Sequence, residues 1–108
     1  MAVASKVYIT QNNTQDIKLF GLMDQDSGLF WTAATATANL YDQNGNLVQE
    51  VSNVPLNYIP NSLGNYLGTV TTDDSIAVGG GYRLVIEAAQ GGSLYHIEVP
   101  CEVIVRVN

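Results

Sequence analysis

The chain is a succession of short segments in which apolar and polar residues alternate. From Thr35 to Tyr41 the even-numbered residues are alanine or leucine, and the odd-numbered ones are mainly polar. From Tyr82 to Ala88 the even positions are again apolar, and Arg83 and Glu87 fall on the other parity. Because successive side chains of a strand point to opposite faces, this period of two predicts strands with one buried face.

The longest alternating run is at the C-terminus, where every odd position from Tyr95 to Val107 is Tyr, Ile, Val or Cys. At about 3.3 Å per residue the run is longer than a typical strand. Pro100 has no amide hydrogen for a sheet, so we expect the run to bend or change partner there. Ser93–Val99 should then form a hairpin with Tyr82–Ala89. Cys101–Val107 should continue as an edge strand or cross to a second sheet.

Clusters of Gly, Asn, Asp and Pro separate the segments at intervals that suit strands better than packed helices. Asn44-Gly45 predicts a tight hairpin, because both residues tolerate positive φ. Thr72–Val78 is ambiguous and could hold one helical turn capped by Thr72 or Asp73. Seven or eight strands predict an all-β fold built as a two-sheet sandwich, with a small closed barrel as the alternative. The other strands are expected at Val7–Thr10, Asp16–Leu22, Leu47–Val51, Leu56–Ile59 and Tyr66–Val70.

Composition favours one small domain with a polar, acidic surface. The 108 residues suit a single domain over 1–108, and 46% hydrophobic residues are enough for a core. A net charge of −6 argues against binding to nucleic acid or to an anionic membrane. The start lacks the pattern of a secretory signal, and no stretch approaches the roughly 20 apolar residues of a membrane span. We therefore expect a soluble protein made in the cytoplasm.

Candidate catalytic groups are few. The only histidine, His96, lies on the outward parity of a strand beside Glu98, where a surface pair is a better interpretation than an acid–base couple. The only cysteine, Cys101, lies on the inward parity and is expected to be a small buried hydrophobe. One His and one Cys cannot complete a zinc site. We expect no enzymatic activity.

The acidic loop Asp24-Gln25-Asp26-Ser27-Gly28 resembles the opening of a calcium loop, so Asp24 and Asp26 are the candidate metal ligands. However, Thr35 stands where an EF-hand has its closing glutamate, and ordinary turn chemistry accounts for the loop better. Gly79–Gly81 precedes a strand and lacks the Lys and Ser/Thr of a phosphate loop. We expect neither a metal nor a cofactor.

Three motifs follow one another in an order known from another family. They are the turn Asp42-Gln43-Asn44-Gly45 between strands, the segment Gly64-Asn65-Tyr66-Leu67-Gly68, and Gly79-Gly80-Gly81-Tyr82. This order resembles macroglobulin-type and related immunoglobulin-like domains. It is most similar to the small stand-alone immunoglobulin-like proteins encoded among the virion genes of tailed bacteriophages and prophages. The similarity covers about Leu22–Ala89, and the ends of the chain match nothing in that family.

The resemblance implies an immunoglobulin-like β-sandwich and a structural role in a virion. The expected function is that of a capsid decoration (cement) protein or a tail or baseplate accessory, made in the host cytoplasm. Its partners would be other virion subunits, with a homo-oligomer as one option. The resemblance brings no catalytic residues with it.

Two kinds of surface are candidates for these contacts. Residues 1–20 and 101–108 could act as arms that add a strand to a neighbouring subunit. Phe30 and Trp31 either cap one end of the sandwich or form a binding tip there. The alternative function is a recognition module that binds carbohydrate or a surface ligand through Phe30, Trp31 and Tyr58. The interface candidates are Phe30, Trp31, Leu94, His96, Glu102, Ile104 and Arg106.

Overall fold

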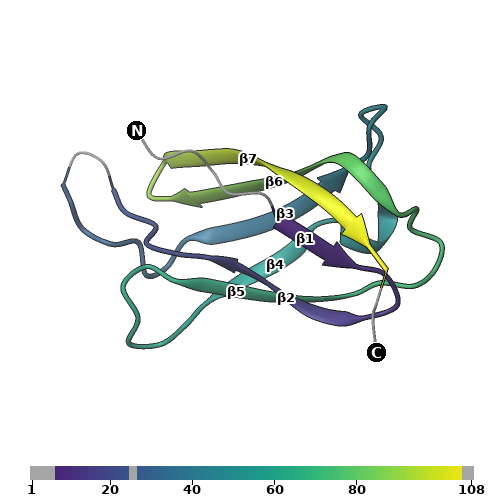
Figure 1. The fold of residues 1–108 in the computed structure, drawn as a ribbon. Coiled ribbons are helices and arrows are strands. Elements are labelled where there is room, and N and C mark those ends of the chain that lie inside the picture. Colours follow the sequence, from purple (N-terminus) through teal and green to yellow (C-terminus); the bar gives the residue numbers. More distant parts are fainter. Residues whose placement is uncertain (1–6, 25–26, 106–108) are drawn as a thin grey trace.

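The structure, a computed structural model, describes residues 7–24 and 27–105, which form seven strands and one short 3-10 helix (Figure 1). No α-helix occurs in this part of the chain, which confirms the all-β prediction and the strand number. The strands are β1 (Val7–Thr10), β2 (Thr14–Leu19), β3 (Thr35–Tyr41), β4 (Val54–Tyr58), β5 (Tyr66–Thr71), β6 (Gly79–Gln90) and β7 (Ser93–Ile104), and the 3-10 helix η1 is Gln49–Val51.

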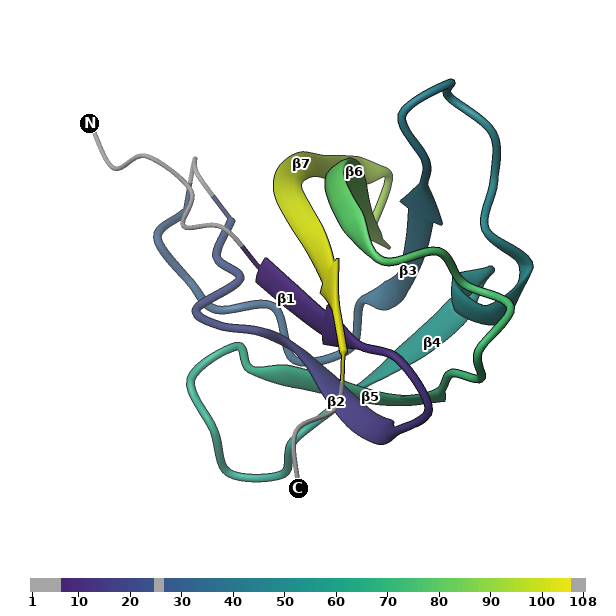
Figure 2. The ribbon, with the colours of Figure 1, turned by 45° about the vertical axis from the view of Figure 1, so that its right-hand side comes forward.

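The strands form one mixed sheet in the order β1-β7-β6-β3-β4-β5-β2. All neighbours are antiparallel except β1 and β7, which run parallel with Val7 opposite Cys101. β4 changes partner along its length: Val54–Leu56 pairs with β3, and Asn57–Tyr58 pairs with β5. The sheet therefore turns a corner at β4 and rolls up until its edges, β1 and β2, come back together (Figure 2). The result is a nearly closed barrel.

The seam between β1 and β2 is held by the side chain of Gln15. The amide nitrogen of Thr10 donates to Gln15 Oε1 at 2.8 Å, and Gln15 Nε2 donates to the carbonyl oxygen of Thr10 at 2.9 Å. The Thr72 hydroxyl donates to the same carbonyl oxygen. The side-chain amide of Gln15 thus replaces the peptide group of a neighbouring strand. It forms hydrogen bonds with the backbone N–H and C=O of Thr10, which no described strand pairs at this edge of the sheet.

The core lies inside this rolled sheet and is made by the faces that the alternation predicted. The even-numbered side chains of β3 are buried, as are those of β6 from Tyr82 to Ala88 and Val99, Cys101 and Val103 of β7. Tyr66 is the largest side chain with no exposure at all. The hairpin between β6 and β7 is confirmed, because Gln90 pairs with Ser93 across two glycines with positive φ.

The expected interruption at Pro100 does not occur. β7 continues from Ser93 to Ile104, with Pro100 opposite Arg83 of β6. In the described residues β7 has a second neighbour only from Cys101 onward, where β1 begins to pair. Pro100 therefore lies where one edge of β7 has no described strand beside it, and sheet edges tolerate proline. The irregularity falls on β6 instead, as a register shift between Gly79 and Tyr82.

The predicted strand at Leu47–Val51 is wrong. Asp42–Asn46 does form a turn, but Leu47 then makes only an isolated bridge to Tyr41. The chain next forms η1, which places Val51 in the core with no exposed surface. Burial of this one valine competes with further pairing to β3.

Two smaller expectations are also corrected. Thr72–Val78 contains no helical turn; Asp73 instead accepts the amide hydrogen of Ser75 in a side-chain turn, and Ile76 is buried. β2 begins earlier than expected and ends at Leu19, so residues 20–22 belong to the following loop. The described parts of the two proposed arms lie within the sheet of their own chain, where Ile9 and Val103 fill the core.

Candidate functional site

Three connections lie together at one end of the barrel (Figure 1). They are the β2–β3 loop (residues 20–34), the β4–β5 loop (residues 59–65) and the β6–β7 turn at Gly91–Gly92. The β1–β2, β3–β4 and β5–β6 connections lie at the opposite end. Loops carried by a rigid sheet are common sites of recognition, so each end is a candidate surface.

Large exposed apolar side chains gather at the first end. The described residues contain nine such side chains, and five of them lie in or directly beside the three connections. We call these five the loop-end cluster: Phe20 (67% exposed), Met23 (45%), Leu29 (70%), Leu63 (67%) and Leu94 (84%). Scattered apolar residues are normal on a surface, but a concentration of this kind is typical of a contact site.

The β2–β3 loop is an ordered hairpin. Met23 bridges to Phe30, and the amide of Asp24 donates to the carbonyl oxygen of Leu29 at 2.8 Å. Asp24 Oδ1 accepts the amide hydrogen of Ser27 at 3.0 Å, and the Asp24 carbonyl accepts that of Gly28 at 2.9 Å. The Asp24 carboxylate thus shapes a turn. Asp26, the other candidate metal ligand, lies outside the described residues, and those residues contain no group of three His, Cys, Asp or Glu that could hold a metal ion.

The β2–β3 and β4–β5 loops are joined to each other. The amide of Leu22 donates to the carbonyl oxygen of Gly64 at 2.9 Å, and the amide of Gly21 donates to Asn65 Oδ1 at 2.9 Å. The contact at Gly64 is so close that a Cβ there would lie 2.4 Å from the Leu22 carbonyl oxygen. The two loops are therefore fixed to each other at Gly21–Leu22 and Gly64–Asn65.

That unit is anchored in the core by Tyr66. Its hydroxyl donates to the carbonyl oxygen of Trp31 at 2.7 Å and accepts the amide hydrogen of Ala34 at 3.0 Å. Trp31 is itself only 5% exposed. A surface fixed in this way loses little conformational entropy when it binds, which favours association.

The sequence predicted only part of this site. Of the predicted tip, Trp31 belongs to the core and Phe30 is half-buried; Leu94, a separate interface candidate, is 84% exposed. The other cluster members were missed. For three of them, Phe20, Leu29 and Leu63, the available signal was a large apolar residue next to a turn glycine, since such a residue has little chance of following the strand alternation into the core. These missed residues are Phe20, Met23, Leu29 and Leu63.

The remaining interface candidates lie elsewhere. His96 is exposed on the outer face of β7, with Nε2 3.3 Å from Glu98 Oε2 and Nδ1 3.9 Å from Glu87 Oε2. Glu102 and Ile104 are half-buried where β7 runs beside β1, toward the opposite end of the barrel. Arg106 lies outside the described residues.

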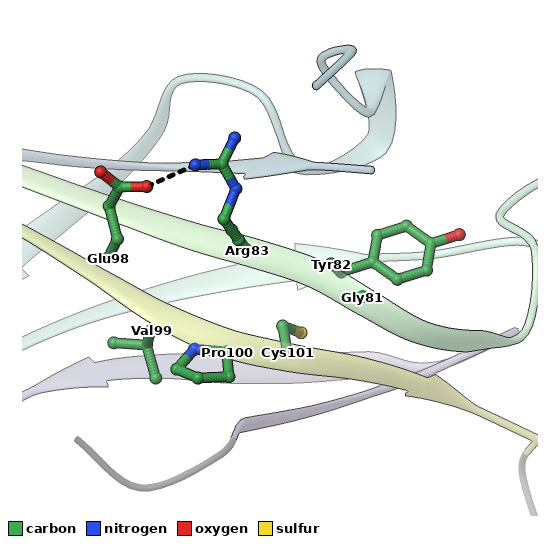
Figure 3. A pocket seen from close by; sticks show the side chains of 7 residues that line it. All are labelled: Gly81, Tyr82, Arg83, Glu98, Val99, Pro100 and Cys101. Carbon is green, nitrogen blue, oxygen red and sulfur yellow. Dashed lines mark hydrogen bonds and ion pairs between the residues drawn. The ribbon is translucent and has the colours of Figure 1, made fainter. Parts of the chain in front are cut away.

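A hollow of about 380 Å³ lies between β6 and β7 (Figure 3). On one side Arg83 Nη1 and Glu98 Oε1 form an ion pair at 2.8 Å, and both side chains are exposed. None of the seven lining residues is a nucleophile with a base beside it, because Cys101 is 1% exposed and no histidine is among them. The lining residues are Gly81, Tyr82, Arg83, Glu98, Val99, Pro100 and Cys101.

Negative charge is concentrated at the end opposite the loop-end cluster, where Asp42, Glu50, Asp73 and Asp74 lie in the β3–β4 and β5–β6 connections. Hydrogen bonds from the hydroxyl and amide of Ser75 lower the pKa of Asp73. By contrast, Asp24 is the only charged side chain in the described part of the three connections that carry the cluster.

Tyr82 stands close to the acidic end, at the start of the regular part of β6. Its hydroxyl donates to the carbonyl oxygen of Ala77 at 2.6 Å. Burial raises the pKa of this tyrosine, and the negative charge of Asp42 raises it further.

Comparisons with known proteins add no identification. The chain matches no protein-family model, and a search of curated proteins finds no significant relative. Among the described residues, none belongs to a helix of the length and hydrophobicity that a membrane crossing needs.

Proposed function

We propose that this protein is a non-enzymatic immunoglobulin-like domain that acts by binding other protein subunits through the loop-end cluster. The observation that carries the proposal is the occurrence of five large exposed apolar side chains at one end of the barrel, four on two loops that hydrogen-bond to each other and the fifth, Leu94, at the start of β7. A contact of this kind requires no reacting group. It requires a rigid, desolvated apolar centre, which is what the loops offer.

Several features support the immunoglobulin-like part of the proposal. β3, β6 and β7 pair as strands C, F and G of such a sandwich do, and β4, β5 and β2 pair as D, E and B do. The bond from Tyr82 to Ala77 matches the tyrosine corner at the start of strand F. Trp31 is buried close to the start of β3, the equivalent of strand C. The corner at β4 joins the two strand sets.

The virion is the setting that the resemblance implies, and we propose a capsid decoration protein or a tail or baseplate accessory. Such a protein needs stable contacts with other subunits, not a substrate pocket. The net charge of −6 argues against a partner made of nucleic acid. An apolar contact surface, whose described connections carry the single charge of Asp24, fits a protein partner better.

Carbohydrate recognition receives less support from the geometry. Stacking on a sugar needs an open aromatic face, but Trp31 is buried. Tyr58 is half-buried, and its hydroxyl is already donated to the carbonyl oxygen of Ser62 at 2.6 Å. The aromatic residues predicted for a sugar site are thus partly or fully buried within the domain.

The test is a binding comparison with matched variants. The tagged chain, L29S/L63S and the control V78S would each be incubated with assembled particles, or with a lysate of the source, and bound proteins identified by mass spectrometry. Val78 is 49% exposed at the opposite end, so V78S removes exposed apolar surface away from the cluster. We expect a protein partner that is retained by wild type and V78S and lost with L29S/L63S. Equal retention by all three chains would contradict the proposal.

A further inference from the structure

We propose that the first half of β7 pairs with the same strand of a second copy of this chain, so that two sheets join across a two-fold axis. This dimer is independent of the loop-end cluster and of the proposed function. β7 pairs with β6 along almost its whole length, but in the described residues β1 covers its other edge only from Cys101 to Ile104 (Figure 1). From Ser93 to Pro100 no described strand lies beside that edge, and such an edge is a template for pairing with another chain. We call this stretch the open edge.

The backbone groups at the open edge belong to the even-numbered residues of β7. Near the end of the strand, the carbonyl oxygen of Ile104 accepts the amide hydrogen of Gln11 at 2.9 Å, so it points to the β1 side. Alternate residues of a strand direct their N–H and C=O to the same edge. Pro100, which has no N–H to offer, has the same parity. The N–H and C=O groups that remain open for a partner strand are therefore those of Leu94, His96 and Glu98.

The core is incompletely covered along the same stretch. Tyr95 and Ile97 point inward from β7 and pack against the core, yet both keep exposed surface. Cys101 and Val103, which lie where β1 is paired, are buried. A strand added at the open edge would cover Tyr95 and Ile97 in the same way. Its inward side chains would have to be apolar, because they would complete the core.

A second copy of β7 supplies a strand of this kind. With the two-fold axis at His96, Leu94 of one copy lies opposite Glu98 of the other, and every open N–H and C=O of the edge faces a partner. On the inner face, Tyr95 then meets Ile97 of the second copy. Aromatic and β-branched side chains opposite each other on antiparallel strands stabilise the pairing.

The ends of the open edge select this register. Moving the axis by one residue toward Pro100 would place that proline, which has no N–H, opposite Leu94. Moving it by one residue the other way would place Glu98 opposite Gly92 in the turn. Only the axis at His96 uses all the open groups of both copies.

The charges at the open edge permit the pairing. Glu98 is offset by Arg83, whose Nη1 lies 2.8 Å from Glu98 Oε1. In the proposed register the two copies of Glu98 are about 13 Å apart along the strands, which exceeds the screening length of about 8 Å at physiological salt. The two His96 rings meet at the axis, each with Nε2 3.3 Å from Oε2 of its own Glu98. Because each copy carries −6, we expect a weak, reversible dimer that is stronger at physiological than at low salt.

His96→Pro tests the pairing most directly. It removes the central N–H of the open edge and leaves the bonds to β6 in place, as Pro100 already does at a position of the same parity. His96→Thr is the matched control, because it changes the side chain and keeps the N–H. In sedimentation velocity over a concentration series, wild type and H96T should dimerise. H96P should weaken the dimer by roughly tenfold or more, and circular dichroism would show that it is folded.

Hydrogen exchange of the wild-type chain, measured by NMR, gives a readout that needs no variant. The amide hydrogens of Leu94, His96 and Glu98 should be protected in the dimer and exchange roughly tenfold faster or more when dilution favours the monomer. Those of Tyr95 and Ile97 bond to β6 and should stay protected at every concentration. This exchange pattern decides the matter by itself if H96P does not fold.

Three results would overturn the dimer. The first is a wild-type chain that stays monomeric with its three edge amides exchanging freely at all concentrations. The second is protection of these amides in a monomer, which would assign the open edge to another segment of the same chain. The third is a dimer that a folded H96P leaves intact. L29S/L63S should not weaken the dimer, so the dimer and the loop-end contact with a protein partner can fail separately.

Discussion

Leu22 donates its amide hydrogen to the carbonyl oxygen of Gly64, and at this point the two loops are as close as two backbones can come. The bond links a loop that precedes β3 to a loop that precedes β5. Through it, the loop that carries Leu29 and the loop that carries Leu63 are held to each other. The geometry of the loop-end cluster therefore depends on a glycine that carries no binding group itself.

Replacing Gly64 by alanine should destabilise the protein far more than the same change at Gly28. Both glycines have nearly the same positive φ, +71° and +72°, so both substitutions carry the backbone strain of about 1–2 kcal/mol. Only at Gly64 would the new methyl group collide with Leu22, which should add about 2 kcal/mol. Urea denaturation of the two variants measures the difference. Equal losses would mean that the close contact is easily relaxed.

Removing the Gln15 side-chain amide should open the seam of the barrel. Gln15→Ala loses two hydrogen bonds to the backbone of Thr10, for which we expect a cost of about 1–3 kcal/mol. The Thr10 amide should then exchange its hydrogen faster, as measured by NMR. Gln15→Glu is the matched variant: it keeps an acceptor for the Thr10 amide but cannot donate to the Thr10 carbonyl at neutral pH. Unchanged exchange at Thr10 in both variants would show that the side chain does not hold the edge.

The raised pKa of Tyr82 predicts a loss of stability in alkali. Because the folded state keeps this tyrosine neutral to a higher pH, its contribution is complete below the unfolded pKa of 10.0 and is lost as pH rises through the folded pKa. Tyr82→Phe should cost about 1 kcal/mol at neutral pH through the lost bond to Ala77. Above pH 10 its melting temperature should fall less steeply than that of wild type. Tyr95→Phe, at a half-buried position on β7, is the control and should keep the wild-type slope.

Deleting residues 102–108 should unfold the chain. The deletion removes Val103, which is completely buried, and takes away three of the four β7 residues with which β1 pairs. Loss of one such side chain from a core costs about 2–5 kcal/mol by itself, which is a large part of the stability of a small domain. Circular dichroism and one-dimensional NMR would show the outcome. A folded monomer that fails only in assembly would instead show that this segment serves as an arm.

The alternation of apolar and polar residues predicted the strands well wherever one face of a strand is buried and the other is exposed to solvent. β3 has the predicted bounds, and the β6–β7 hairpin turns where two adjacent glycines were available. The pattern could not show η1, because the reason for it is a pocket in the core that Val51 fills. Nor could the pattern show that β7 continues through Pro100 without a break. A proline is tolerated there because no described strand pairs with that edge of β7.

The candidate site was less accessible to sequence reasoning. An aromatic pair drew attention to Phe30 and Trp31, yet Trp31 is the residue that Tyr66 holds in the interior. Phe20 and Leu63 lie in loops, where the alternation of apolar and polar residues does not predict which side chains are exposed. Two loops more than 30 residues apart in sequence meet at Leu22 and Gly64, and no local pattern reports such a meeting.

The parallel pairing of β1 with β7 has a consequence for how the chain acquires its structure. Val7–Thr10 is synthesised well before its partner, Cys101–Ile104, because the five other strands of the described sheet lie between them in the chain. During synthesis the first strand must therefore wait, with Ile9 unburied, while the middle of the sheet assembles. Contacts this distant along a chain slow folding and prolong the life of partly folded species. A chaperone that shields β1 until its partner strand has been made should raise the yield of native protein.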